Sequence, residues 1–250
     1  MLMLLSHPLQ SFKVDSLTRR WAAFLLLLLV WGVSFCFFLK PPGDPDFSQL
    51  LFWYEDMQEA ADPYAFMMQN PFDTVFTWQN VIYIGAFFLY MFFLYLSGLF
   101  YFVMYICDKR EVAFKRVPYV FFSRVGWIVL LTGVTFFPAL LMFSVLPYVF
   151  LVLIPALYAL PGLVFFEKKN SFSAIAGSIN VTRGMKFSIF FELSVIVLIF
   201  MLINGVLSWI LNTDSVGYFM VYGFVMSYFT LVVARNMGIR YHMITMLSKE

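Results

Sequence analysis

The chain has 250 residues, of which 62% are hydrophobic, 21% aromatic and only 12% charged. A soluble domain usually carries about 25% charged residues, so an apolar excess of this size excludes a soluble globule and predicts an all-α integral membrane protein. The net charge of +2 is small, and few basic residues lie away from the ends of apolar runs, so nothing indicates a nucleic-acid partner.

The first element is expected to be an interfacial helix over residues 6–20, because Pro8 suits a first helical turn. Arg19 and Arg20 then mark the edge of the membrane. The apolar run 21–39 is long enough to cross a hydrocarbon core of about 30 Å. A cleaved signal peptide is the alternative. The run is long for one and offers no small-residue cleavage site, so a retained span is expected.

Residues 40–80 form the only long polar segment. Proline and glycine at positions 41–45 stop the preceding helix, and a further helix is expected over 47–61. The segment contains a single base, Lys40. Its seven acids are Asp44, Asp46, Glu55, Asp56, Glu59, Asp62 and Asp73. It is too short for a core of its own, so we expect it to lie on the membrane surface or to cap the bundle.

The second span is expected over 81–107, with surplus length that permits tilt. A second interfacial element follows over 112–125, where Pro118 breaks or restarts the helix. The next apolar stretch is twice too long for one span, and we divide it near residues 144–147 into a helical hairpin. Prolines inside this hairpin are expected to kink its helices, at Pro138, Pro155 and Pro161.

A third interfacial helix is expected over 171–186, and a basic polar tail follows the last span. The expected spans are 21–39, 81–107, 126–144, 146–166, 187–211 and 218–234. We therefore predict about six transmembrane helices arranged as three hairpins, each preceded by a cytoplasmic interfacial amphipathic helix.

Charge is distributed unevenly between the loops. If the loops alternate between two faces, 15 of the 16 Lys and Arg residues fall on one face and only Lys40 on the other. The positive-inside rule makes the basic face cytoplasmic, so both termini are expected inside and the acidic loop 40–80 outside. The candidate interfacial basic residues, expected to lie near membrane lipids, are Arg19, Arg124, Lys168, Lys169 and Arg183.

A weak internal repeat accompanies these boundaries. Three pairs each close an amphipathic stretch before an apolar run, namely Thr18-Arg19, Ser123-Arg124 and Thr182-Arg183. The segments 108–111 (DKRE) and 167–170 (EKKN) also align, at an offset of 59 residues. Three parallel units would explain this pattern. The positive-inside rule alone would also place a basic residue at each boundary, so both interpretations stay open.

Residues 155–191 carry a further pattern. Pro155-Ala-Leu-Tyr-Ala-Leu-Pro161 is followed by a short charged turn, by a segment from Ser173 to Ser178, and by Thr182-Arg183-Gly184. This pattern resembles the YciC-like family and the membrane domain fused to some glycerophosphodiester phosphodiesterases, although Met185 stands where an aromatic residue often follows the glycine. The resemblance implies a bacterial cytoplasmic-membrane protein with a six-helix, partly interfacial fold. It implies no catalysis, because the phosphodiesterase domain is absent from these residues.

Sequence signatures of catalysis and metal binding are missing. The two histidines, His7 and His242, lie in the terminal segments, and neither H-E-x-x-H nor a Cys–His cluster occurs. The nucleotide-binding motif G-x-x-x-x-G-K-[S/T] and the hydrolase motif G-x-S-x-G are also absent. We therefore expect no enzymatic activity, no metal and no cofactor.

Glu192 is the one acid inside an expected span, roughly 8 Å from its start. Because an unpaired carboxylate in lipid is costly, it must be neutral, paired or close to water. It is either a proton or cation site, or a carboxylate that reaches back to Lys186 or Arg183. Asn204 is either an interhelical hydrogen-bonding group or part of a substrate path. Glu192 and Asn204 form the candidate intramembrane polar site.

Four of the glycines inside the expected spans are expected to permit close approach of helices, namely Gly98, Gly133, Gly205 and Gly223. No G-x-x-x-G pair occurs, so the sequence names no dimerisation face.

Two functions are compatible with these features. The first is a non-catalytic multi-pass membrane subunit or scaffold of a membrane protein complex, which explains the missing chemistry. The alternative is a transporter or carrier of a lipid or small apolar molecule. The alternative predicts a water-accessible cavity that contains Glu192, whereas a closed bundle favours the subunit. We favour the subunit, with membrane lipids and other membrane protein subunits as partners.

Overall fold

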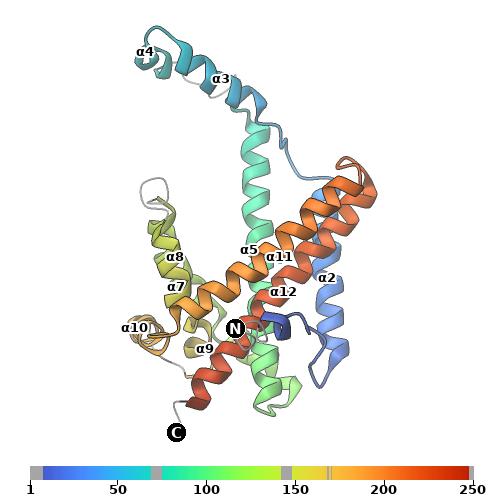
Figure 1. Cartoon of the computed structure of the whole chain (residues 1–250), viewed down its shortest axis with the longest axis vertical. Coiled ribbons are helices and arrows are strands. Elements are labelled where there is room, and N and C mark those ends of the chain that lie inside the picture. The colour runs from blue at the N-terminus through green and yellow to red at the C-terminus, as the bar shows by residue number, and fades with distance from the viewer. Residues whose placement is uncertain (1–7, 69–74, 142–147, 168, 170, 248–250) are drawn as a thin grey trace.

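The computed structural model describes residues 8–68, 75–141, 148–167, 169 and 171–247 (Figure 1). Within these residues the fold is all-helical, as the composition predicts. The helices are α2 (Arg20–Leu39), α3 (Ser48–Glu59), α4 (Pro63–Met67), α5 (Trp78–Lys109), α6 (Val117–Phe122), α7 (Val125–Leu141), α8 (Tyr148–Ala156), α9 (Leu160–Phe165), α10 (Ser171–Val181), α11 (Lys186–Ile210) and α12 (Val216–Leu247), with a 3-10 turn, η1 (Phe114–Arg116), before α6.

Four of the described helices are long and apolar enough to cross a membrane. They are α2, α5, α11 and the stretch Val216–Met246 of α12. A fifth candidate combines the helical segments Phe114–Phe122 and Val125–Thr135, which are bent by 46° at their junction. Length and composition therefore indicate a multi-pass membrane protein. The six spans predicted from the sequence are not confirmed.

The stretch predicted as the third and fourth spans is divided more finely than expected. Its hairpin junction, predicted near 144–147, lies outside the described residues. Beyond it, α8 has nine residues and α9 has six, so neither alone can cross a membrane. Pro161 stands in the first turn of α9 instead of kinking a longer helix, because a fixed φ and a missing N–H suit that position. Pro155 lies inside α8.

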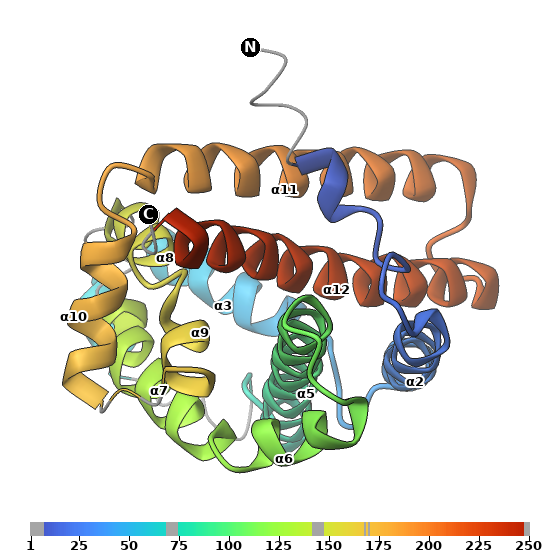
Figure 2. The same ribbon diagram turned by 90° about the horizontal axis from the view of Figure 1, so that it is seen from below.

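The central element is α12. It packs along α2 and α5 on one side and against α11 on the other, as the two ribbon views show (Figures 1 and 2). Residues from α5 and α12 supply half of the largest fully buried side chains, among them Tyr101, Phe102, Leu231 and Tyr241. A second group of helices lies beside this centre, with α9 contacting α5 and α8 contacting α11. The core therefore follows the contact between α5 and α12.

Glycines allow close approach at two of these helix crossings. Gly223 of α12 lies against α2, and a Cβ added there would stand 3.0 Å from the backbone nitrogen of Phe35. Gly98 of α5 lies against α12, where an added Cβ would stand 3.4 Å from the methyl group of Thr230. The prediction of close approach is confirmed at these two positions. Gly133 and Gly205 have no described atom within 4 Å of an added Cβ, so no close helix approach is seen at these two positions among the described residues.

The first residues of α5 are held by a capping box. The Thr77 hydroxyl accepts a hydrogen bond from the Asn80 backbone N–H at 3.3 Å, and Asn80 Oδ1 accepts one from the Thr77 backbone N–H at 3.0 Å. The Asn80 amide also donates to the carbonyls of Asp44 at 3.0 Å and Asp46 at 2.8 Å. One buried side chain therefore ties the segment that follows α2 to the start of α5.

The last residues of α5 form a Schellman motif. After the final residue Lys109, Glu111 adopts a φ of 56°, in the left-handed region that glycine usually occupies. The Val112 N–H donates to the carbonyl of Cys107 at 2.9 Å, and the Glu111 N–H donates to that of Asp108 at 3.2 Å. This pattern reverses the chain at once and directs it into η1 and α6.

Helices α3 and α4 form an arm that extends from the acidic segment, away from the centre (Figure 1). The helix predicted over 47–61 is confirmed as α3, and none of its residues is buried. Asp62 caps α4 by accepting hydrogen bonds from the backbone N–H groups of Tyr64 and Ala65 at 3.0 and 3.1 Å. Asp73 of the same segment lies outside the described residues.

The N-terminal segment differs from the interfacial helix predicted over 6–20. Only residues 8–11 of its described part are helical, and turns lead from there to α2. Buried groups of the bundle bind its backbone instead of leaving it on a lipid surface. Tyr101 donates to the carbonyl of Val14 at 2.6 Å, and Tyr228 donates to that of Phe12. The segment is therefore part of the core.

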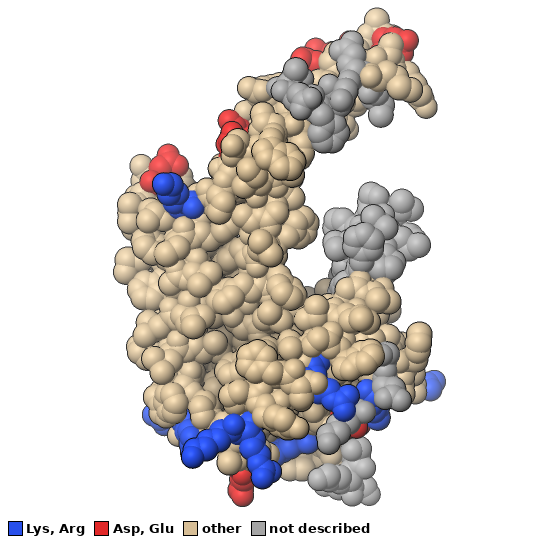
Figure 3. Space-filling model, turned by 180° about the vertical axis from the view of Figure 1, so that it is seen from behind, with Lys and Arg blue, Asp and Glu red and all other residues tan. Residues whose placement is uncertain are grey.

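Charged side chains separate to two ends of the molecule, as the space-filling view shows (Figure 3). Lys and Arg gather at the end where α2 begins and α5 finishes, whereas most acids on this face lie toward the α3–α4 arm. The band between them is almost uncharged on this face. An uncharged band between charged ends is compatible with a surface that faces a bilayer.

Candidate functional site

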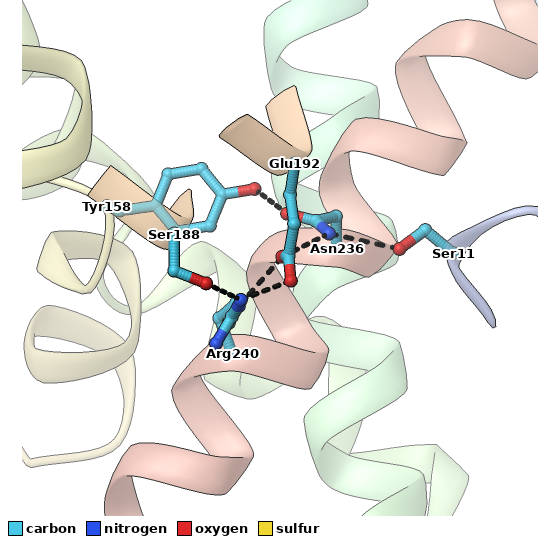
Figure 4. Close-up of polar contacts among 6 residues, drawn as sticks. All are labelled: Ser11, Tyr158, Ser188, Glu192, Asn236 and Arg240. Atoms are coloured by element: carbon cyan, nitrogen blue, oxygen red, sulfur yellow. Dashed lines mark hydrogen bonds and ion pairs between the residues drawn. The ribbon is translucent and has the colours of Figure 1, made fainter. Parts of the chain in front are cut away.

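Glu192 lies in the second turn of α11 and is completely buried. Its partner is Arg240 of α12, which forms a two-pronged ion pair with it (Figure 4). Arg240 Nε donates to Glu192 Oε2 at 2.7 Å, and Arg240 Nη2 donates to Oε1. The same Nη2 donates to the Ser188 hydroxyl at 2.6 Å. The guanidinium group therefore clamps two residues on one face of α11.

Asn236 extends this site to two further segments. Its amide nitrogen donates to Glu192 Oε2 at 3.2 Å and to the Ser11 hydroxyl at 3.1 Å. Its amide oxygen accepts a hydrogen bond from Tyr158, which lies in the turn between α8 and α9 (Figure 4). We call Ser11, Tyr158, Ser188, Glu192, Asn236 and Arg240 the polar cluster. It joins α11, α12, the N-terminal segment and the α8–α9 turn.

The charged and polar groups of the polar cluster are paired with one another, as is typical of a structural contact. The carboxylate of Glu192 faces one guanidinium and one amide, so both of its oxygens accept hydrogen bonds. A buried ion pair is tolerated when such geometry and additional hydrogen bonds offset the loss of water. This geometry favours a structural contact over a cation-binding site.

The sequence singled out Glu192 but not its partner. Lys186 and Arg183 were the basic residues expected beside Glu192, yet Arg240 binds it. The sixth span was expected to end near residue 234 and a tail to follow, whereas α12 continues to Leu247. The spacing of Asn236 and Arg240 could have indicated this contact, because the two residues are four positions apart on α12 and share one helical face.

Asn204 does not join Glu192. The two residues are twelve positions apart on α11, roughly 18 Å along the helix axis. The Oδ1 atom of Asn204 is buried and accepts no hydrogen bond within the described part of the chain. The candidate intramembrane site is therefore divided into a satisfied polar cluster around Glu192 and an unsatisfied amide at Asn204.

A second buried arginine, which the sequence reading left in the tail, holds the N-terminal segment. Arg235 Nε donates to the carbonyl of Gln10 at 3.0 Å, and Nη2 donates to the Ser16 hydroxyl. The guanidinium also lies 5.1 Å from the centre of the Tyr105 ring, a distance that allows a cation–π interaction. Arg235 and the polar cluster together attach the N-terminal segment to α12.

The predicted interfacial basic residues lie at the ends of helices. Arg19 precedes α2, and its guanidinium lies 5.2 Å from the centre of the Phe114 ring. Arg124 and Arg183 lie in the turns before α7 and α11. Lys169 forms an ion pair with Glu167 at 3.1 Å. Lys168 and His7 lie outside the described residues.

Cavities of about 230–500 Å³ occur at four places in the described structure. The largest of these four, of about 500 Å³, is a largely apolar groove between α8, α11 and α12. Neither Glu192 nor Asn204 lines any of the four. Among the described residues, no three His, Cys, Asp or Glu side chains are grouped so as to hold a metal ion.

Comparisons with protein-family models, with curated proteins and with solved structures found no match for this chain. The YciC-like resemblance therefore stays an expectation from residues 155–191.

Proposed function

We propose that the chain is a non-catalytic multi-pass membrane subunit or scaffold that assembles with other membrane proteins through α11. The observation that carries this proposal is the buried Oδ1 atom of Asn204, which accepts no hydrogen bond from any described residue. An amide oxygen without a donor is costly in hydrocarbon. Lipid tails offer no donor, whereas a polar side chain on a partner helix does.

The surroundings of Asn204 support a partner helix at this place. Only 22% of the most apolar stretch of α11 is buried, the same share as in α2, against 50% for α5. Gly205 has no described atom within 4 Å of an added Cβ, so the backbone is open to close approach. Large exposed apolar side chains surround it, namely Met201, Leu202, Ile203, Val206 and Trp209. A helix packed here would cover these side chains and place a donor beside the half-buried Asn204, whose amide must turn outward to bond with it.

The polar cluster supports the same proposal. A carrier that used Glu192 would need the carboxylate to face water or substrate, yet its oxygens accept bonds from Arg240 and Asn236. A fixed ion pair suits a subunit that keeps one conformation and presents its surface to a partner.

We also propose the finer arrangement that the sequence predicts. It consists of six spans in three hairpins, the second and third preceded by cytoplasmic interfacial helices, in a bacterial cytoplasmic membrane with both termini inside. The separation of charge between the two ends supports the orientation. The YciC-like resemblance of residues 155–191 supports the bacterial membrane and the six helices.

One observation favours the alternative, a carrier of a lipid or small apolar molecule. The groove of about 500 Å³ between α8, α11 and α12 has the size and apolar lining of a ligand site. A carrier would need this groove to open and close, so a cross-link between α8 and α11 would abolish its activity. A subunit would tolerate the same cross-link.

Photo-cross-linking in native membranes tests the proposed subunit. A photoreactive amino acid at Val206, on the open face of α11, is expected to capture a discrete protein partner. The matched control is Leu29 of α2, which is also an exposed apolar residue in a span, and it should capture lipid alone. Capture of lipid alone at both positions would contradict the proposal.

A second measurement connects the partner to Asn204. Purification in a gentle detergent followed by mass spectrometry should recover the captured partner with the wild-type chain. Asn204→Leu should reduce its recovery, because the amide can no longer bond across the interface. Ser208→Ala is the control, since this hydroxyl already bonds to the Gly205 carbonyl within α11. Equal recovery from both variants would exclude Asn204 from the interface.

A further inference from the structure

A cavity of about 400 Å³ lies where α2 begins and α5 ends. Its walls come from residues 17–19, from the last turns of α5, and from the segment 111–117 that leads into η1 and α6. This volume falls within the range of small-molecule sites. The residues that line this cavity take no part in the contacts described above for Glu192 or Asn204.

Charged groups of both signs line this cavity. Arg19 is the base, and Asp108 and Glu111 are the acids. None of the three forms an ion pair with another described residue. The Asp108 carboxylate accepts the backbone N–H of Thr18 at 3.2 Å, which leaves it further capacity as an acceptor. The site therefore offers separate partners for an anion and for a cation.

The backbone conformation of Glu111 lowers the stability of the fold. Glu111 occupies the left-handed position of the Schellman motif with a φ of 56°. Glycine fits that position without strain, whereas a residue with a side chain does not. Strained backbone of this kind is concentrated at binding and catalytic sites. Glu111 therefore combines a strained backbone with a place in the wall of the cavity.

The cavity lies at the level where a membrane changes from hydrocarbon to headgroups. Two candidate spans meet it, because α2 begins at Arg20 and α5 ends at Lys109. Trp21 is about half exposed and its ring meets that of Phe114 edge-on at 5.4 Å. Tryptophan at the end of a span is typical of the headgroup region.

We propose that this cavity binds the headgroup of a phospholipid that carries both a phosphate and a primary ammonium, as phosphatidylethanolamine does. Arg19 binds the phosphate through charge-assisted hydrogen bonds. Asp108 and Glu111 accept N–H groups from the ammonium. A purely anionic headgroup would meet two carboxylates without a compensating cation, and a quaternary ammonium has no N–H to donate. This inference does not depend on the partner at α11.

Native mass spectrometry on the full chain tests the selectivity. The protein is taken from nanodiscs that contain equal amounts of phosphatidylethanolamine, phosphatidylcholine and phosphatidylglycerol. Wild-type protein should retain phosphatidylethanolamine roughly tenfold over the other two, the factor that one hydrogen bond to a charged group supplies. Arg19→Gln should lower the retention of all three lipids, because each carries a phosphate, whereas Glu111→Gln should remove most of the preference for phosphatidylethanolamine. Arg20→Gln, a neighbouring arginine outside this cavity, should keep it. Equal retention of the three lipids by wild-type protein would overturn the proposal.

Glu111→Gly separates binding from folding. Glycine relieves the left-handed strain, so the thermal unfolding temperature should rise, while retention of phosphatidylethanolamine should fall. A purely structural Glu111 would predict unchanged lipid retention in this stabilised variant, and that result would overturn the proposal.

Competition distinguishes a membrane lipid from a soluble molecule with the same headgroup. Soluble glycerophosphoethanolamine should displace the retained lipid only at high concentration, because it lacks the acyl chains. Displacement at equal concentration would show that the cavity serves a soluble ligand and would overturn its assignment to a lipid.

Discussion

Arg240 and Glu192 are buried charges whose contribution depends on each other. A guanidinium left without its carboxylate keeps the full cost of burial, whereas loss of both charges removes the cost together with the attraction. The hydrogen bonds to Ser188 and Asn236 increase the energetic coupling between Arg240 and Glu192, because they orient both charged groups. The pair therefore acts as one unit in folding.

A double-mutant cycle measures this coupling. Glu192→Gln alone should lower the free energy of unfolding by about 3–5 kcal/mol, since Arg240 is then unpaired. The double variant with Arg240→Gln should lose less than the sum of the two single changes. Lys186→Gln is the control, because that residue has no described ion pair, and it should change stability by less than about 0.5 kcal/mol. Unfolding in detergent, followed by tryptophan fluorescence, gives these values. Additive losses would show that the two charges act independently.

At the scale of elements, α12 determines the architecture because it contacts α2, α5 and α11. Its last turns also meet α9, where Gly162 lies against the ring of Tyr241 so closely that an added Cβ would overlap it. Both residues are buried. Gly162 is thus one of the positions at which the second group of helices packs against the centre.

Gly162→Ala should therefore destabilise the protein by about 1–3 kcal/mol, the usual cost of overpacking a core. Gly126→Ala in α7 is the matched control. It has no described atom within 4 Å of its added Cβ, and alanine favours a helix over glycine, so its stability should be equal or higher. Thermal unfolding of the two variants checks the prediction. An equal midpoint for Gly162→Ala and wild type would show that α9 can move away from Tyr241 without loss.

The elements also show how far the sequence could predict this fold. The apolar runs that become α2, α5 and α11 were located to within a few residues, because an uncharged run of that length leaves few alternatives. The end of α12 was missed, because Arg235 and Arg240 read as a solvated tail. Their burial depends on Ser16, Glu192 and other groups distant in sequence. Local pattern carries no information about such contacts.

For the whole molecule, the separation of charge predicts one orientation in the membrane. The Lys and Arg residues at the basic end should face the cytoplasm, and the α3–α4 arm should face the opposite compartment. Charge alone sets this expectation, since each candidate span is apolar along its length.

Cysteine labelling in intact cells checks the orientation. Asp56→Cys on the arm and Lys115→Cys at the basic end are both exposed positions, and each is introduced with Cys36 and Cys107 replaced by alanine. A membrane-impermeant maleimide should label position 56 in intact cells and position 115 only after lysis. The reverse pattern would invert the proposed topology.

The length of α5 has a mechanical consequence. A helix of 32 residues measures about 48 Å, whereas the hydrocarbon core is about 30 Å thick. Roughly 18 Å therefore remain beyond the lipid tails, and the Thr77–Asn80 cap keeps that end wound and joined to the segment after α2. The helix thus acts as a rigid stalk that carries α3 and α4 clear of the bilayer. The reach of the arm is fixed by the number of residues in α5, so each turn removed would bring it about 5.4 Å closer to the membrane.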